Sequence, residues 1–189
     1  MTGKPLRADA RRNQETLLDA AAAVFVRQGV EAPVRAIATE AGVGTATIYR
    51  HFPTRADLIV AVYRHQVESL AARGPELAGS GATPHATPHE ALGRWLHEFV
   101  DFVITKHGLP AALQSADPCY DPLHDYFVER LEPVCAELLR AAEASGEINP
   151  GQDAYELMRA VGSLCAGSGT TRTYDARHLV GLLVAGLRK

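Results

Sequence analysis

Three features that are absent or scarce narrow the classes to which this 189-residue chain can belong. No apolar stretch is long enough to cross a bilayer, because the longest run without polar side chains extends only from Leu179 to Leu187. The three cysteines are odd in number and widely spaced, which favours reduced thiols in the cytoplasm over a disulfide framework. No segment has a persuasive strand pattern. We therefore expect a soluble, cytoplasmic, all-α protein.

Recognisable catalytic motifs are also lacking. The sequence Gly167-Ser168-Gly169 has neither the preceding strand nor the flanking spacing of a nucleophile elbow. None of the cysteines has a histidine at a familiar offset. We expect no enzymatic activity and no cofactor.

A metal site has limited support. His85 and His89 are four residues apart, but His85 falls in a stretch rich in Gly, Pro, Ser and Thr, and no tight ligand cluster results. The residues that could contribute ligands are His85, His89, His97, His107, Cys119 and His124. A metal-responsive protein therefore remains an alternative.

The formal net charge of −3 is unevenly distributed. Residues 1–65 hold nine Lys and Arg against six Asp and Glu, which gives +3, so the remainder carries −6. Phosphate contacts supply most of the sequence-independent attraction to DNA, and this charge pattern suits a protein that touches DNA at one end only.

A helix-turn-helix pattern occupies residues 35–52. Ile37, Ala38 and Ala41 share one face of a first helix, and the small Ala38 suits the closest approach between two steeply crossing helices. Gly42 stands where this helix must end, in the left-handed conformation that glycine tolerates. A second helix follows, with Ile48 facing inward. The alternative is an ordinary αα-corner of a helical protein.

The outer face of the second helix carries hydroxyl, imidazole and guanidinium groups. These groups suit phosphates and base edges in the DNA grooves. The residues on this face are Thr45, Ala46, Thr47, Tyr49, Arg50 and His51. The pattern therefore predicts a DNA-reading surface.

Apolar periodicity and capping signals divide the chain into about nine helices in two domains. We expect a helix-turn-helix domain over residues 1–54, a connecting helix over 55–72, a linker over 73–88, and a helical bundle over 89–189. The first helix is expected to start near Asp9 or Asn13. Capping residues are predicted to open later helices at Thr54, Thr87, Asp121, Asp153 and Asp175.

The first third of the chain resembles the DNA-binding domain of the tetracycline-repressor (TetR) family. The residues that carry the resemblance are Leu17-Leu18-Asp19-Ala20-Ala21, Phe25, Gly29, Ile37-Ala38, Ala41-Gly42-Val43, Ile48-Tyr49, His51-Phe52, Arg55 and Leu58. The resemblance implies that residues 45–51 enter the major groove and that Tyr49 and His51 hold phosphates. Arg55 stands where the family usually has a phosphate-binding lysine.

The chain departs from the family pattern just before the first helix of the motif. Pro33-Val34 stand where a Ser or Thr usually caps that helix and touches phosphate, which leaves Arg35 as the expected backbone contact. Arg11 and Arg12 complete the residues that we expect to contact DNA.

The same resemblance implies a homodimer that releases a palindromic operator when a small molecule fills a cavity in the bundle. The predicted cavity residues are Trp95, Phe99, Phe102, Cys119, Tyr120, His124, Phe127 and Met158. The predicted dimer residues are Leu157, Val161, Leu164, Leu179, Leu182 and Leu183. An aromatic stripe at helical spacing is also typical of a packed core, so core packing remains the alternative for the first set.

We therefore expect a ligand-responsive, DNA-binding repressor with a largely apolar effector and no membrane partner. The alternatives are a metal-responsive regulator of the same fold, or an interaction protein that does not bind DNA.

Overall fold

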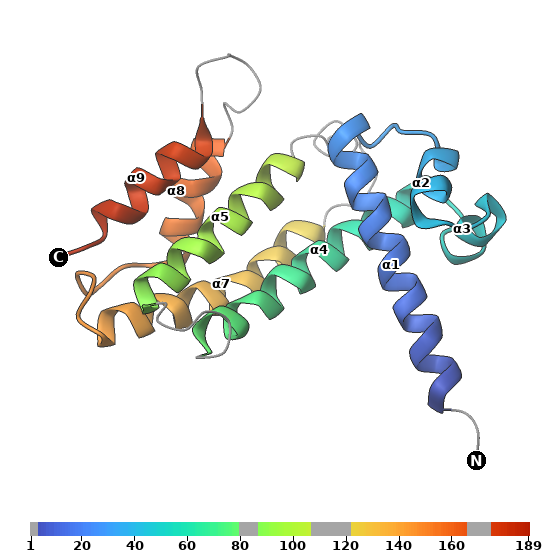
Figure 1. Ribbon diagram of the computed structural model, residues 1–189. Coiled ribbons are helices and arrows are strands. Elements are labelled where there is room, and N and C mark those ends of the chain that lie inside the picture. The colour runs from blue at the N-terminus through green and yellow to red at the C-terminus, as the bar shows by residue number, and fades with distance from the viewer. Residues whose placement is uncertain (1–3, 80–86, 107–121, 166–174) are drawn as a thin grey trace. The chain divides into compact units, whose positions relative to one another are not determined.

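A computed structural model describes residues 4–79, 87–106, 122–165 and 175–189 (Figure 1). Within these ranges the helices are α1 (Lys4–Gln28), α2 (Val34–Ala41), α3 (Thr45–His51), α4 (Arg55–Ala78), α5 (Pro88–Lys106), α7 (Pro122–Ala144), α8 (Ala154–Cys165) and α9 (Ala176–Gly186). The predicted all-α class is confirmed. Eight helices are described where about nine were expected. None of the described helices could span a membrane.

The chain forms two compact units, which divide between Gln66 and Val67 in the middle of α4. The N-terminal unit contains α1, α2, α3 and the first half of α4. The C-terminal unit contains the second half of α4 together with α5, nearly all of α7, α8 and α9. A single continuous helix therefore contributes to both units.

The N-terminal unit packs around the apolar face predicted for the first helix. Leu17, Leu18, Ala21, Val24 and Phe25 are all buried. Two polar links add to this core: His65 on α4 lies 2.7 Å from Asp19 on α1, and Arg27 donates to Glu40 on α2 at 2.7 Å. These contacts hold α2 and α4 against α1.

Capping boxes begin two of the helices where they were predicted. The Asp57 carboxylate accepts from the Thr54 amide at 3.0 Å, and the Thr54 hydroxyl accepts from the Asp57 amide at 3.1 Å. Thr87 and Glu90 make the same reciprocal pair at the start of α5. Each pair satisfies amide groups that the first helical turn leaves without a partner.

Single carboxylates cap the last two helices. Asp153 accepts from the Glu156 amide at 2.8 Å, and Asp175 accepts from the His178 amide at 3.1 Å. Both helices therefore begin where the sequence indicated. α7 begins at Pro122 and continues through Pro133, while the cap expected from Asp121 lies outside the described residues.

Two helix boundaries differ from the prediction. α1 begins at Lys4, before the expected caps Asp9 and Asn13, because Pro5 falls in the first turn, where a missing amide hydrogen does no harm. α4 continues to Ala78, so the first six residues of the predicted linker are helical. Arg73 stabilises this extension by donating to Glu76 at 2.6 Å and to Glu98 of α5 at 3.0 Å.

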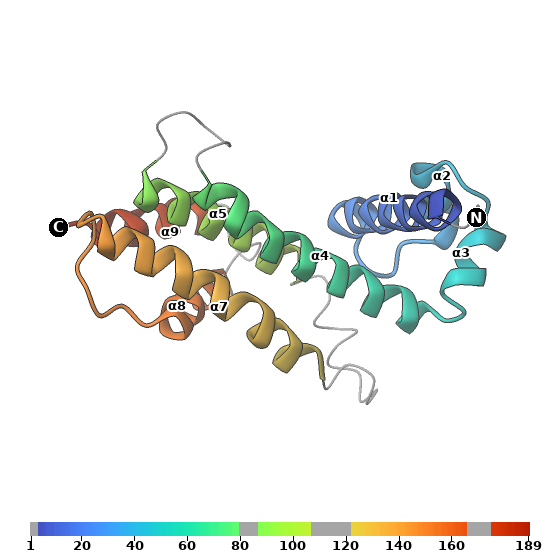
Figure 2. The same ribbon diagram turned by 90° about the horizontal axis from the view of Figure 1, so that it is seen from below.

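In the C-terminal unit, α4 and α7 lie side by side (Figures 1 and 2). The two helices pack closely at Gly74, where an added Cβ would overlap Cγ1 of Val134. Trp95 of α5 is fully buried beside this contact, and its indole nitrogen donates to the Leu70 carbonyl at 3.0 Å. The absence of a side chain at Gly74 therefore sets the spacing between α4 and α7.

The end of the chain is held against the α7–α8 connection. Ile148 and Arg188 form an isolated antiparallel bridge, and the Lys189 amide donates to the Glu147 carbonyl at 3.2 Å. His89, which is buried at the start of α5, lies 2.9 Å from the Val184 carbonyl through Nε2 and accepts from Arg188 at 3.2 Å through Nδ1. These contacts fix α9 against α5.

Candidate DNA-binding surface and effector cavity

The turn between α2 and α3 has the geometry that the sequence predicted. Gly42 has φ +66°, in the left-handed region, and the Val43 amide donates to the Ala38 carbonyl at 3.0 Å. Ile37, Ala38 and Ile48 are buried between the two helices. With its inner side occupied in this way, α3 presents its other residues outward.

The outward residues of α3 are the ones predicted to contact DNA. Thr45, Ala46, Arg50 and His51 are exposed, Tyr49 is 52% exposed, and Thr47 is half-buried. The Arg50 guanidinium donates to the Thr47 hydroxyl at 3.2 Å. These side chains form what we call the α3 surface: Thr45, Ala46, Thr47, Tyr49, Arg50 and His51.

Two exposed arginines of this unit, Arg35 and Arg50, keep their positive charge available for DNA. Arg35 at the start of α2 and Arg50 on α3 are exposed, and neither forms an ion pair with a described carboxylate. Arg12 on α1 is also exposed, and Arg11 precedes it in α1 but its side chain is not described. The exposed positive charge of the unit thus includes both helices of the motif.

Arg55 has an internal partner that the sequence did not reveal. Its guanidinium donates to the carbonyls of Val30 and Ala32, the latter at 2.7 Å, and lies 3.8 Å from Glu31. Arg55 therefore holds the α1–α2 connection against α4. Its predicted contact with DNA stays a prediction, and a carbonyl pair 23 to 25 residues away leaves no local signal in the sequence.

The C-terminal unit contains an apolar cavity of about 430 Å³. Its walls come from α5, α7 and α8, and its volume lies within the range typical of small-molecule sites. The residues that line it are Phe99, Val103, His124, Phe127, Tyr155, Met158, Arg159 and Gly162. Four of the predicted cavity residues, Phe99, His124, Phe127 and Met158, are among them.

The other predicted cavity residues are placed differently. Trp95 is a core residue, because its indole has both a stacking partner in Phe99 and a backbone acceptor. Phe102 is buried and stacks on Phe127 with ring centroids 5.8 Å apart. Neither lines the cavity, and Cys119 and Tyr120 lie outside the described residues.

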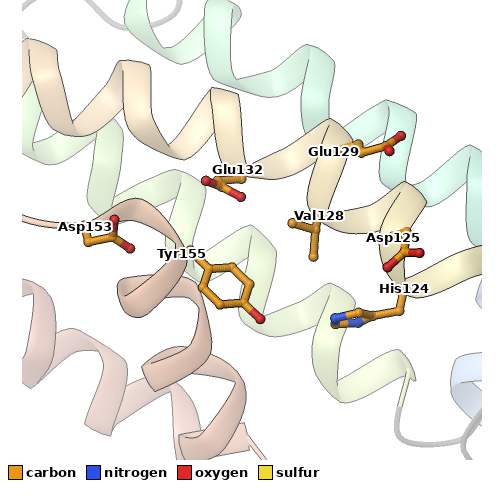
Figure 3. A pocket seen from close by; sticks show the side chains of 7 residues that line it. All are labelled: His124, Asp125, Val128, Glu129, Glu132, Asp153 and Tyr155. Carbon is orange, nitrogen blue, oxygen red and sulfur yellow. The ribbon is translucent and has the colours of Figure 1, made fainter.

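An open acidic groove of about 500 Å³ adjoins the cavity (Figure 3). His124 and Tyr155 line both spaces. The remaining lining residues of the groove are Asp125, Val128, Glu129, Glu132 and Asp153. Arg159 lines the cavity and is the single Lys or Arg among the residues that line these two spaces. Its guanidinium carbon lies 5.9 Å from the centre of the Tyr155 ring.

The predicted dimer residues divide into two groups. Leu182 is 57% exposed, and Leu164, Leu179 and Leu183 are partly exposed. Leu157 and Val161 are instead buried within this chain, because α8 turns that side toward its own bundle. They are therefore core residues of this chain, and their contact with a partner chain stays a prediction.

No group of three metal-binding side chains gathers among the residues that the structure describes. His85, His107 and Cys119, which were needed for the metal-responsive alternative, fall outside those residues. The two described cysteines, Cys135 and Cys165, are buried, and burial raises the pKa of their thiols to about 12 and about 11.

Comparisons with known proteins agree with this architecture. Residues 17–62 match the model described as "Bacterial regulatory proteins, tetR family", and residues 87–189 match "Transcriptional regulator SbtR-like, C-terminal domain". The crystal structure of the TetR transcriptional regulator SCO0520 from Streptomyces coelicolor is 32% identical, with a TM-score of 0.77. That match covers 92% of this chain and 97% of the regulator.

Two more distant proteins are also similar to this chain. The HTH-type transcriptional repressor KstR of Mycobacterium tuberculosis is 26% identical over 80% of this chain, and the match spans 66% of the repressor's own length. The regulator FadR of Bacillus subtilis, solved in complex with stearoyl-CoA, is 19% identical and covers 92% of this chain and 97% of its own, with a TM-score of 0.59.

Proposed function

Because the chain belongs to the TetR family of bacterial transcriptional regulators, we propose that it represses transcription by binding an operator through the α3 surface. The observation that carries this proposal is the exposure of Tyr49, Arg50 and His51 on a helix whose inner side is anchored by Ile48. We further propose that it acts in the cytoplasm as a homodimer, with two α3 helices in successive major grooves about 34 to 36 Å apart.

The test begins with duplexes selected by the purified protein from a random pool. Tyr49→Ala and His51→Ala are each expected to weaken binding to the selected operator by about tenfold or more, since a hydrogen bond to a charged phosphate contributes about 1.5 kcal/mol or more. Affinity is measured by fluorescence anisotropy at several salt concentrations.

The control is Glu137→Ala, an exposed position on α7 away from the α3 surface, for which operator affinity should not change. If both α3 variants bind as the parent protein does, α3 does not dock on DNA. If the parent selects no duplex, or if its affinity does not fall with added salt, the chain is an interaction protein without a DNA target.

We propose that a small molecule in the 430 Å³ cavity releases the operator. KstR is a repressor and the FadR structure contains stearoyl-CoA, but a likeness of 19% identity shows the fold alone, so the class of effector is argued from the cavity itself. The wall formed by Phe99, Phe127 and Met158 suits an apolar body. The four carboxylates of the adjoining groove repel an anionic head group, and they outnumber the single guanidinium of Arg159 in the cavity wall.

Three ten-carbon probes distinguish the head groups: decanol, decyltrimethylammonium and decanoate. Neutral and cationic probes are expected to raise the melting temperature more than decanoate, because a molecule that binds the folded state stabilises it. Glu132→Gln should lower the advantage of the ammonium probe, whereas Glu137→Gln, also on α7 but outside the groove, should not. A larger rise of the melting temperature with decanoate would contradict the proposal of a neutral or cationic effector. The separate proposal that the protein binds an operator would still stand.

A further inference from the structure

One carboxylate joins α4 to α7 in the C-terminal unit. Glu68 accepts from the Tyr126 hydroxyl and from two nitrogens of Arg130, Nε at 2.7 Å and Nη2 at 2.6 Å. The guanidinium thus meets both carboxylate oxygens in a two-pronged arrangement that fixes direction as well as distance. The hydrogen bond from Arg130 is the largest influence that lowers the pKa of Glu68, so the carboxylate stays ionised near neutral pH.

The position of this cluster along α4 distinguishes it from other surface ion pairs. Glu68 lies two residues beyond Gln66, at the start of the part of α4 that belongs to the C-terminal unit. The other half of the same unbroken helix, from Arg55 to Gln66, belongs to the N-terminal unit. Whatever rotates or shifts α4 near Glu68 therefore acts on the helix that leads directly to the DNA-binding unit.

The other end of the cluster belongs to the cavity wall. Tyr126 and Arg130 lie in the first turns of α7, and the same turns contribute His124 and Phe127 to the cavity. A helical turn moves as one body because its backbone is held by its own hydrogen bonds. A molecule that displaces His124 or Phe127 therefore displaces the two donors of Glu68 as well.

We propose that Glu68, Tyr126 and Arg130 couple occupancy of the cavity to the position of α4, with Glu68 as the positioning residue. This inference rests on the proposed function and specifies how the effector site is connected to DNA binding. The pair formed by Arg177 of α9 and Asp101 of α5 is exposed to a similar degree, but neither of its residues belongs to α4. It provides a matched control.

The experiment replaces the unknown effector with a side chain. Met158→Trp places a larger group in the cavity from α8, and Val103→Phe does so independently from α5. Operator affinity is measured for the parent, for Met158→Trp, for Glu68→Gln and for the double variant, with the full chain and the duplex selected above. Melting temperatures are recorded for all four proteins.

Filling the cavity is expected to weaken operator binding by about tenfold, within the range of 5- to 150-fold typical of coupled sites. In the Glu68→Gln background the same substitution is expected to change affinity by less than about twofold, because the connection to α4 has been removed. In the Arg177→Gln background the effect should remain at about tenfold. A role in stability alone would lower the melting temperature without removing this coupling.

Three results would each overturn the proposal. The first is an equal effect of Met158→Trp with and without Glu68. The second is unchanged operator affinity in both Met158→Trp and Val103→Phe when these variants are folded. Tyr126→Phe combined with Arg130→Gln should reproduce the result of Glu68→Gln, and coupling that persists in that variant also contradicts the proposal. Failure of the parent protein to bind any duplex is a separate outcome, which removes the proposed function itself.

Discussion

At the scale of single residues, Gly42 and Gly162 show why identical amino acids require different explanations. Gly42 has φ +66° at the end of α2, whereas Gly162 lies within α8 and lines the cavity. Apart from the adjoining backbone of the chain, a Cβ built at either position meets no atom within 4 Å. Both positions therefore have room for a methyl group, and they differ in backbone conformation.

Gly42→Ala is expected to lower the free energy of unfolding by about 1 to 2 kcal/mol, because the left-handed conformation brings Cβ against the following carbonyl. Gly162→Ala is expected to raise it by about 0.5 to 1 kcal/mol, since alanine favours the helix interior. Urea denaturation measures both. Changes of the same sign would show that backbone conformation does not determine the outcome.

The sequence predicted much at this scale, where the signal is local. The hydrogen bonds made at Thr54, Thr87, Asp153 and Asp175 join each residue to one three positions further along the chain, and they confirm the predicted caps. The partners of Trp95 and Arg55 were not predictable, because Leu70, Val30 and Ala32 lie 23 to 25 residues away in the chain. Such contacts exist only once the helices are packed.

At the scale of elements, the pairing of α4 with α7 depends on the missing side chain at Gly74. Nothing local marks this glycine as different from others in the chain, and the linker predicted from residue 73 would have ended the helix before it. The helix instead continues, because Val134 of α7 fills the space above Gly74 and Arg73 is held by Glu98. Packing across the bundle therefore overrode the local signal.

Gly74→Ala is expected to destabilise the protein by about 1 to 3 kcal/mol, because the added methyl group overlaps a branched side chain in a close-packed contact. Adding Val134→Ala should recover part of this loss by removing the overlapping Cγ1. Thermal or urea unfolding of the two single variants and the double variant gives the interaction energy. Additive losses would show that the two residues do not meet.

At the scale of the whole molecule, the exposed apolar residues on α9 bear on assembly. Leu182 is 57% exposed on a helix that is otherwise rich in apolar residues. Leu157 and Val161, which the sequence analysis predicted for the same interface, are buried in the core of their own bundle. Periodicity locates an apolar face but does not distinguish a neighbour within the chain from one outside it.

Leu182→Glu is expected to convert the proposed homodimer into a monomer, because a charge at the centre of an apolar interface loses its hydration. Sedimentation equilibrium measures the mass, and operator affinity should fall because a monomer reaches only one half-site. Val26→Glu, which is 60% exposed on α1, is the control for the mass measurement. If the parent protein itself sediments as a monomer, the proposed homodimer is wrong.

Because α4 belongs to both units, it also limits where the chain can be cut into separate fragments. A fragment that stops at Gln66 would cut a helix in mid-course, and one that keeps all of α4 would carry Val67, Leu70 and Leu77 into water without the bundle that buries them. The first fragment loses part of a helix, and the second exposes an apolar surface that favours aggregation. Domain-swapped chimaeras with other regulators should therefore exchange α4 and its bundle together rather than be joined within this helix.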